Sequence, residues 1–351
     1  MPKPGTSLRI LAALVAAAAL AAVAVGTAGA SPARHSGTTI TGAGSTFVRP
    51  LVATWIAGVG AAYGYDLQYS AIGSSGGINA ITGRTVDFGA SDAPMTPDQF
   101  TACNGCEQIP WALAGTSVMY NLPGVKNLLH MDGPTLGKIF LGQITKWDDP
   151  AIAKLNPGVS LPSTAITIAH RSDGSGTTFN FTDYLSAVSP AWKSQVGSGT
   201  SVNWPVGVGG RGSSGVSALV AQTAGTIGYA DVAFALKNHF SYFAMKNASG
   251  KFTTPGLRGI LAAASSGQKP DSTNFISIVN PPKRYPNAYP ICTYTYVIVP
   301  LQSAKAPDVK KFLFWAVTKG QTAQYTASLR FVPIPKGVLV LAEKAIAKLH
   351  G

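Results

Sequence analysis

The sequence repeats one local pattern: a strand-like stretch, then a short run of glycine, serine and threonine, then a helix-like stretch. Residues 67–71 alternate between apolar and polar side chains, which favours a strand. Residues 73–77 (Gly-Ser-Ser-Gly-Gly) follow, and Ile78 and Ile81 begin a helical spacing. Strands that alternate with helices in this way imply an α/β fold built on mostly parallel sheets.

The octet 171–178 (Arg-Ser-Asp-Gly-Ser-Gly-Thr-Thr) occupies the same position in a second unit. Residues 166–170 alternate like a strand before it, and apolar residues at 181, 185 and 188 follow at helical spacing. Residues 85–89 predict a short strand before 90–94, and residues 42–47 precede a helix with Pro50 in its first turn. In parallel sheets, ligands bind where such loops leave the carboxyl ends of the strands.

Three other segments have simpler interpretations. Asp149 and Pro150 predict the start of a helix over 151–155. Residues 338–349 predict an amphipathic helix, and the glycine-rich stretch 207–215 predicts a loop because apolar periodicity resumes immediately after it.

The composition favours an exported protein of two ordinary domains. The chain has 351 residues, of which 46% are hydrophobic and only 12% are charged. Its net charge of +13 would attract anions, but no block of lysine and arginine interleaved with aromatic residues points to nucleic acid.

The first 30 residues predict a cleaved signal peptide. Lys3 and Arg9 form a basic start, residues 10–25 are apolar, and Ala28-Gly29-Ala30 suits a cleavage site. The apolar run is just shorter than the roughly 17 residues that a membrane span needs, so cleavage after Ala30 is favoured over an uncleaved anchor. Removing the two basic residues leaves a mature charge of +11.

The cysteines predict one disulfide and one inert thiol. Cys103 and Cys106 enclose Asn104-Gly105, and in an oxidising compartment such a pair favours a small-loop disulfide over a zinc half-site or redox motif. Cys292 lies in an apolar run and is expected to be buried in a strand.

The octet has the composition of an oxyanion site. Arg171 supplies a permanent charge, and Asp173 is close enough in sequence to pair with it and orient it. Gly174, Ser175 and Gly176 then offer backbone N–H groups at a helix start. The alternative, an ordinary surface arginine, is less favoured because these features occur together.

Asp92 has the wrong charge for an anion site unless the anion carries a proton. A carboxylate can accept a hydrogen bond from a P–OH group, whereas sulfate would present only lone pairs to it. This mismatch costs at least about 1–3 kcal/mol, so Asp92 would select phosphate over sulfate. The simpler alternative is that Asp92 caps a helix.

Enzyme motifs are weak in this chain. Residues 73–77 match G-x-S-x-G, but no histidine lies in a recognisable catalytic loop. Residues 207–212 match G-x-G-x-x-G, but we expect no helix to open inside that segment and no acidic strand residue about 20 positions later. There is no Walker sequence and no metal-binding cluster, so we expect no cofactor and no metal.

Taken together, these motifs resemble the periplasmic phosphate-binding proteins of phosphate-specific ABC transporters, within the type II periplasmic binding protein superfamily. The resemblance covers nearly all of the mature chain. It is carried by residues 41–47, 72–77, 87–94, 141–149, 156–158, 171–178 and 225–229. The pair Cys103 and Cys106, the basic charge and the missing lipid-attachment cysteine depart from the family pattern.

The resemblance implies a set of phosphate ligands. Phe47 would donate through its backbone N–H, Asp92 would accept the phosphate proton, and Arg171 would be the charged donor held by Asp173. The complete implied set is Thr46, Phe47, Ser74, Asp92, Arg171, Ser175, Gly176 and Thr177.

The resemblance also implies two α/β lobes, each a mostly parallel sheet flanked by helices, joined by two hinge strands. The first crossing is expected near Trp111–Tyr120 and the return near Tyr289–Val297. Lobe I would comprise residues 38–113 plus 292–351, and lobe II residues 114–291.

The implied function is high-affinity phosphate binding outside the cytoplasmic membrane and delivery to the permease and ATPase subunits of an ABC importer. The protein is expected to be a monomer, periplasmic or at the cell surface, and not an enzyme. Two alternatives stay open: a secreted phosphatase or serine hydrolase on the same scaffold, and a basic surface-adhesion protein.

Overall fold

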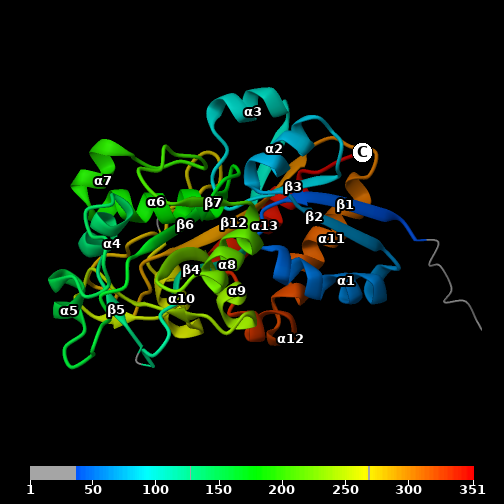
Figure 1. The fold of residues 1–351 in the computed structure, drawn as a ribbon. Coiled ribbons are helices and arrows are strands. Elements are labelled where there is room, and N and C mark those ends of the chain that lie inside the picture. Colours follow the sequence, from blue (N-terminus) through cyan, green and yellow to red (C-terminus); the bar gives the residue numbers. More distant parts are fainter. Residues whose placement is uncertain (1–36, 127, 268) are drawn as a thin grey trace, which may run out of the picture. The chain divides into compact units, whose positions relative to one another are not determined.

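A nine-stranded sheet organises the chain (Figure 1). The computed structural model describes residues 37–126, 128–267 and 269–351, so the predicted signal peptide lies outside the described residues. The strand order is β2-β1-β3-β12-β4-β8-β6-β7, and β9 also pairs with β4. The strands of this sheet are β1 (Thr39–Gly44), β2 (Asp66–Ala71), β3 (Phe88–Ser91), β4 (Cys106–Tyr120), β6 (Thr167–Arg171), β7 (Val208–Gly210), β8 (Thr226–Asp231), β9 (Ser241–Tyr242) and β12 (Cys292–Pro300).

Two groups of parallel strands point toward each other within this sheet. Strands β1, β2 and β3 are parallel, as are β6, β7 and β8, and the long strand β4 connects the groups. The first part of β4 pairs with β12, and its last part, from Thr116, pairs antiparallel with β8. By register, the carboxyl end of β3 lies level with Pro110 of β4, and the carboxyl end of β8 lies level with Thr116. Both groups therefore direct their terminal loops into one region.

Helices cover both groups of strands. In Figure 1, α2 and α3 lie on one side of β1–β3, and α1 and α11 lie on the other. A small sheet of order β11-β10-β5 stands apart. The remaining elements are α1 (Arg49–Tyr63), α2 (Ser74–Thr82), α3 (Pro97–Cys103), β5 (His130–Met131), α4 (Gly133–Phe140), α5 (Pro150–Leu155), α6 (Gly176–Val188), α7 (Pro190–Gln195), α8 (Gly212–Gln222), α9 (Val232–Lys237), β10 (Ala244–Lys246), β11 (Phe252–Thr253), α10 (Leu257–Ala264), α11 (Ala306–Val317), the 3-10 turns Lys319–Gln321 and Ala327–Leu329, α12 (Ala323–Thr326) and α13 (Lys336–Ala347).

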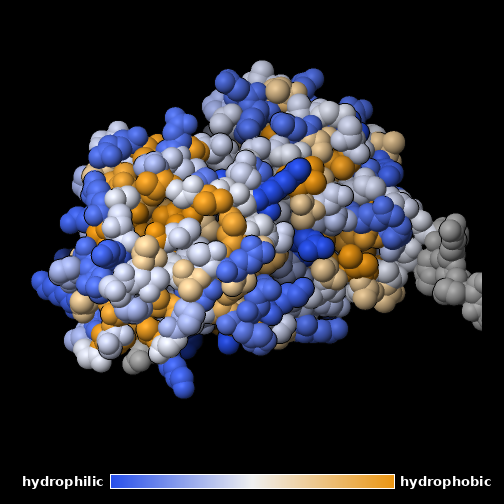
Figure 2. Space-filling view, viewed as in Figure 1, coloured by the Kyte–Doolittle hydropathy of each residue, from blue (hydrophilic) through white to orange (hydrophobic). Residues whose placement is uncertain are grey.

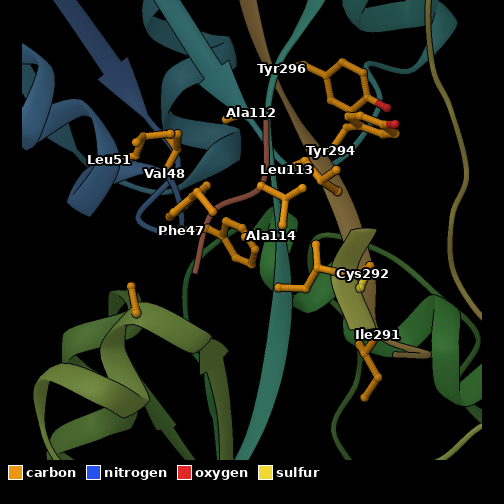
Figure 3. Close-up of a cluster of buried hydrophobic side chains, with 14 of the residues drawn as sticks. Phe47, Val48, Leu51, Ala112, Leu113, Ala114, Ile291, Cys292, Tyr294 and Tyr296 are labelled. Carbon is orange, nitrogen blue, oxygen red and sulfur yellow. The ribbon is translucent and has the colours of Figure 1, made fainter. Parts of the chain in front are cut away.

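The hydrophobic core runs along the two long central strands. Every residue of β12 is buried, and in β4 only Glu107 is partly exposed, as expected for strands covered on both faces. Figure 3 shows Phe47, Val48 and Leu51 packed beside Leu113 and Ala114 of β4. The loop after β1 is thereby anchored in the core.

Most local predictions are confirmed. Strands form at 66–71 and 167–171, Asp149 caps α5, and Pro50 lies in the first turn of α1. A disulfide joins Cys103 and Cys106, and Cys292 is a buried free thiol in β12.

The strand predicted at 85–89 is shifted toward the C-terminus. Strand β3 begins at Phe88, although the backbone N–H of Asp87 already donates to the carbonyl oxygen of Thr41 in β1 at 2.8 Å. The carboxylate of Asp87 accepts hydrogen bonds from the backbone N–H and the hydroxyl of Thr41 and forms an ion pair with Lys305.

The loop predicted over 207–215 is wrong. Residues 208–210 form β7, and α8 begins at Gly212, so a helix does open inside the G-x-G-x-x-G segment. Asp231 also ends a strand about 20 residues later, contrary to the expectation. The segment still differs from a dinucleotide fingerprint, which requires a strand before its first glycine, because here the glycines form the strand itself.

The hinge prediction is supported by a change of partner along β4. Strand β4 leaves β12 at Gly115 and joins β8 at Thr116, inside the predicted first crossing. Residues from 37 onward nevertheless belong to one compact unit, so the lobe boundaries at 113/114 and 291/292 stay a prediction.

Among the residues that the structure describes, no helix is both long and apolar enough to cross a membrane. Figure 2 shows hydrophilic and hydrophobic residues interspersed over the face that it displays.

Gly44, the last residue of β1, tests how closely the site-forming loops are packed. A methyl group there would clash with the carbonyl oxygen of Ala90, and its φ of +141° is unfavourable for other residues. Gly64→Ala is the control, because Gly64 has φ +71° but open space around it. We expect this variant to lose about 1–2 kcal/mol of unfolding free energy. Gly44→Ala should lose at least twice as much unfolding free energy in urea titrations. Equal losses would contradict this packing.

Candidate oxyanion-binding site

The predicted site residues follow the carboxyl ends of β1, β2, β3 and β6. The structure brings all of them into one buried region, although they are spread over more than 130 positions of the sequence. Even the charged members are almost inaccessible, with Arg171 4% and Asp92 1% exposed. Burial of this kind replaces water around the charges with fixed protein groups.

Arg171 is held by two side chains. Its Nε and Nη2 donate to Oδ1 and Oδ2 of Asp173 at 2.7 and 2.5 Å, and its Nη1 donates to Oγ1 of Thr46 at 3.1 Å. The backbone N–H of Gly212 also donates to Asp173, at 2.9 Å. Burial alone would raise the pKa of Asp173, but the Arg171 guanidinium and these hydrogen bonds lower it below its ordinary value. The ion pair therefore fixes the fork of Arg171.

Asp92 is positioned by hydroxyl groups. Ser45 donates to its Oδ1 at 2.6 Å, and Thr177 donates to its Oδ2 at 3.5 Å. Burial raises the pKa of Asp92 to about 6, against the opposing effects of Ser45, Thr295, Arg171 and Thr177. At neutral pH this carboxylate is therefore ionised but retains a high affinity for a proton.

Ser74 connects the loops after β2, β3 and β6. Its Oγ accepts from the backbone N–H of Gly176 at 2.9 Å and from that of Asp92 at 3.3 Å. The contact is so close that a Cβ atom at Gly176 would lie 2.6 Å from both Ser74 Oγ and Asp92 N. Glycine at position 176 is therefore required for this approach.

The start of α6 directs backbone donors into the same region. Ser175 caps the helix, and its Oγ accepts from Thr178 N at 3.1 Å. Gly176 and Thr177 are in the first turn, where N–H groups lack partners within the helix and the helix dipole favours a negative charge.

Phe47 can contribute only through its backbone. Its ring is fully buried and packs edge-on against Phe331, with 6.0 Å between centroids. Its N–H donates to Ser45 Oγ at 3.0 Å, so this donor already points toward the hydroxyl that holds Asp92.

Sequence reasoning missed Ser45 and Ser213. Ser213 lies in the first turn of α8, where its hydroxyl is 2.9 Å from Thr46 Oγ1 and its N–H donates to that atom at 3.3 Å. Ser213 stands in the glycine-rich stretch 207–215, for which the sequence predicts a loop. Asp92, in contrast, caps no helix, because α3 starts at Pro97 with Thr96 as its N-cap.

Among the residues that the structure describes, no hydrogen bond joins the Ser75 hydroxyl to a histidine. The Ser75 hydroxyl contacts Thr200 at 3.5 Å, and His170 instead stacks on Trp204 with 4.8 Å between centroids. Within the described ranges, no group of histidine, cysteine, aspartate or glutamate residues could hold a metal ion.

A pocket of about 380 Å³ adjoins this region. Its lining includes Thr46, Tyr69 and Asp173 together with Arg49 and Arg211. Both arginines are exposed.

Comparisons with known proteins agree with this geometry. A family model described as a PBP superfamily domain matches residues 28–319. The phosphate-binding protein PstS of Xylella fastidiosa (strain Temecula1) is 42% identical over 304 residues, covering 86% of this chain and 82% of that protein. The protein of the same name from Pasteurella multocida (strain Pm70) is 39% identical over 306 residues, covering 86% and 88%. The chain belongs to the PstS family within the PBP superfamily.

Solved structures establish the fold that the PstS family membership implies. A periplasmic phosphate-binding protein, solved at subatomic resolution with phosphate bound, superposes with a TM-score of 0.70 at 21% identity, covering 88% of this chain and 93% of that one. A phosphate-binding protein from Stenotrophomonas maltophilia gives a TM-score of 0.66 at 17% identity, with the same coverage. The predicted two-lobed α/β fold is thereby confirmed.

The raised pKa of Asp92 predicts a pH-dependent stability. The folded protein binds this proton more tightly than the unfolded chain, so the stabilisation contributed by Asp92 is fully present below about pH 4 and is lost as pH rises through about 6. Asp92→Asn has no ionisable group at this position. As pH rises from 4 to 7, its free energy of unfolding should therefore increase by on the order of 3 kcal/mol relative to that of wild type in phosphate-free urea titrations. The exposed Asp98→Asn serves as the control. A constant difference between Asp92→Asn and wild type across this range would contradict the assignment.

Proposed function

We propose that this chain binds inorganic phosphate outside the cytoplasmic membrane and delivers it to an ABC-type importer. The observation that carries the proposal is that the oriented Arg171 and the buried carboxylate of Asp92, which hydroxyl groups hold, lie in one site. This site is called the cage below and comprises Thr46, Phe47, Ser74, Asp92, Arg171, Ser175, Gly176 and Thr177. The relatives named phosphate-binding protein PstS support it, and they are named for binding rather than for catalysis.

The charges of the cage explain why phosphate would suit it. Asp173 balances Arg171, and ionised Asp92 leaves this group with a net negative charge. An anion must therefore be stabilised mainly by neutral donors, and the proposed ligands supply many: the hydroxyls of Thr46, Ser74, Ser175 and Thr177 and the N–H groups of Phe47, Gly176 and Thr177. In the structure three of these hydroxyls have other partners, and they would rotate toward the ligand: Thr46 contacts the Ser213 hydroxyl, Ser74 accepts from the N–H of Gly176, and Thr177 donates to Asp92.

Asp92 would supply the selectivity. Phosphate that carries a proton can donate it to the carboxylate, whereas sulfate cannot, and a buried lone-pair contact costs at least about 1–3 kcal/mol. The high proton affinity of Asp92 makes it a strong acceptor for such a hydrogen bond.

Transport would use the two-lobed architecture. The proposed lobe I supplies Thr46, Ser74 and Asp92, and the proposed lobe II supplies Arg171 and the start of α6. Closure of the lobes would bury phosphate and present one surface to the permease. Export would depend on the signal peptide predicted over residues 1–30.

Isothermal titration with phosphate and with sulfate tests the proposed function. Wild type should bind phosphate at least about tenfold more tightly than sulfate. Asp92→Asn should lower the ratio of phosphate affinity to sulfate affinity by a larger factor than it lowers the phosphate affinity itself. Asp98→Asn should leave this ratio unchanged. Tight sulfate binding without a phosphate response would refute the proposal, and an unchanged ratio in Asp92→Asn would mean that another group senses the proton.

A matched pair of glycine variants tests whether the cage requires the close contact of its loops. At Gly176 an added methyl would press on backbone and on Ser74, whereas at Gly83, which follows α2, it would make only ordinary contacts, the nearest at 3.4 Å to the carbonyl oxygen of Asn79. Gly176→Ala should weaken phosphate binding by about a hundredfold or more, and Gly83→Ala by about tenfold or less. Equal effects would show that the loops do not need this approach.

A further inference from the structure

A second buried carboxyl group, Asp231, lies near enough to Asp92 for their charges to interact. Asp231 ends β8, caps α9 and is fully buried. Its Oδ1 accepts from Phe234 N at 3.2 Å, but its Oδ2 has no hydrogen-bond partner among the described residues. A buried oxygen without a partner is rare in folded proteins and needs an explanation.

Asn180 presents the complementary problem on α6. It lies one helical turn after Thr177, which contacts Asp92, and it is 1% exposed. Its Nδ2 donates to Thr116 Oγ1 at 2.7 Å, while its Oδ1 is buried without a partner in the part of the chain that is described.

Strand pairing and one hydrogen bond place both side chains next to the same residue, Thr116. Thr116 of β4 is directly opposite Asp231 of β8, so their side chains leave the same face of the sheet about 5 Å apart. The amide of Asn180 is bonded to the Thr116 hydroxyl, so Thr116 has the Asn180 amide as a bonded partner and Asp231 as its cross-strand neighbour. Two acceptor oxygens cannot satisfy each other, but a proton on one of them would satisfy both.

We propose that Asp231 is a neutral carboxylic acid that donates its proton to Asn180 Oδ1, and that this proton keeps a second negative charge away from the oxyanion cage. This inference rests on the proposed function. In this role Asp231 would not touch phosphate, but its protonation state would set the net charge of the buried groups next to Asp92.

The groups around Asp231 favour the neutral form. Burial raises the pKa of Asp231 well above its ordinary value, and the charge of Asp92 raises it further. Helix α8 carries no titratable side chain, Lys237 of α9 is exposed, and Arg171 of β6 is paired with Asp173. Burial raises the pKa values of Tyr184, Tyr229, Tyr289 and Cys292 and lowers that of His170, so none of these groups is charged at neutral pH. Asp183 of α6 is half-buried, and burial raises its pKa as well.

Of these two acids, only Asp92 therefore carries a negative charge at neutral pH, and Asp231 keeps its proton. Asp92 has Ser45, Thr177, Thr295 and Arg171 to stabilise the ionised form, whereas Asp231 has mainly backbone N–H groups at the start of α9. Environments that separate two nearby carboxyl groups in this way assign them different protonation states.

Infrared difference spectra between wild type and each variant at pH 7.5 test directly whether Asp231 carries a proton. Wild type should show a carboxylic-acid C=O band that Asp231→Asn removes. Asp132→Asn is the control, because Asp132 caps α4 through Thr135 N in the same way and should leave the band in place. Asn180→Ala should shift the band by removing the acceptor, and it keeps the test valid if Asp231→Asn does not fold. Absence of the band, or an unshifted band in Asn180→Ala, would overturn the proposal.

Phosphate titration provides an independent readout. Asp231→Asn has the same charge as the neutral acid, so its affinity for phosphate should stay within about threefold of wild type at pH 7.5. If Asp231 were ionised, its removal would tighten phosphate binding by about tenfold or more, and that result would overturn the inference. Failure of wild type to bind phosphate would instead refute the proposed function, and the infrared result would stand separately.

Discussion

The bidentate ion pair between Arg171 and Asp173 is the interaction on which the site depends. It fixes the only charged donor of the proposed ligand set, and Asp173 also receives the N–H of Gly212 at the start of α8. Through Thr46, the same arginine reaches the loop after β1, so one side chain links segments more than 120 residues apart. Loss of this pair would release both the charge and the contact between loops.

The ion pair also explains why the cage needs so many neutral donors. Because Asp173 neutralises the charge of Arg171, the arginine contributes oriented N–H donors more than net positive charge. The hydroxyls and the helix N–H groups must therefore stabilise an anion. Asp92 then adds a negative charge where a generic anion site would have none. A neutral Asp231 near it would confine this penalty to one carboxylate, which is consistent with selection for an anion that carries a proton.

The sequence predicted the parts of the site that follow a local pattern. The octet 171–178, the loop at 73–77 and the segment around Asp92 each combine small residues with strand and helix periodicity, and all three meet at the carboxyl ends of strands. Ser213 was missed because its stretch is so rich in glycine that the short strand β7 has no periodicity to reveal it. The pairing of Asp231 with Thr116 is a long-range register between strands, and no local spacing encodes it.

A crystal structure of the protein grown with inorganic phosphate tests the central claim most directly. We expect phosphate to contact Arg171, the first turn of α6, Ser74 and the loop at Thr46 together, with one phosphate oxygen within hydrogen-bond distance of Asp92. Phosphate bound instead between Arg49 and Arg211 in the adjoining pocket, or bound in the cage without any contact to Asp92, would contradict this assignment.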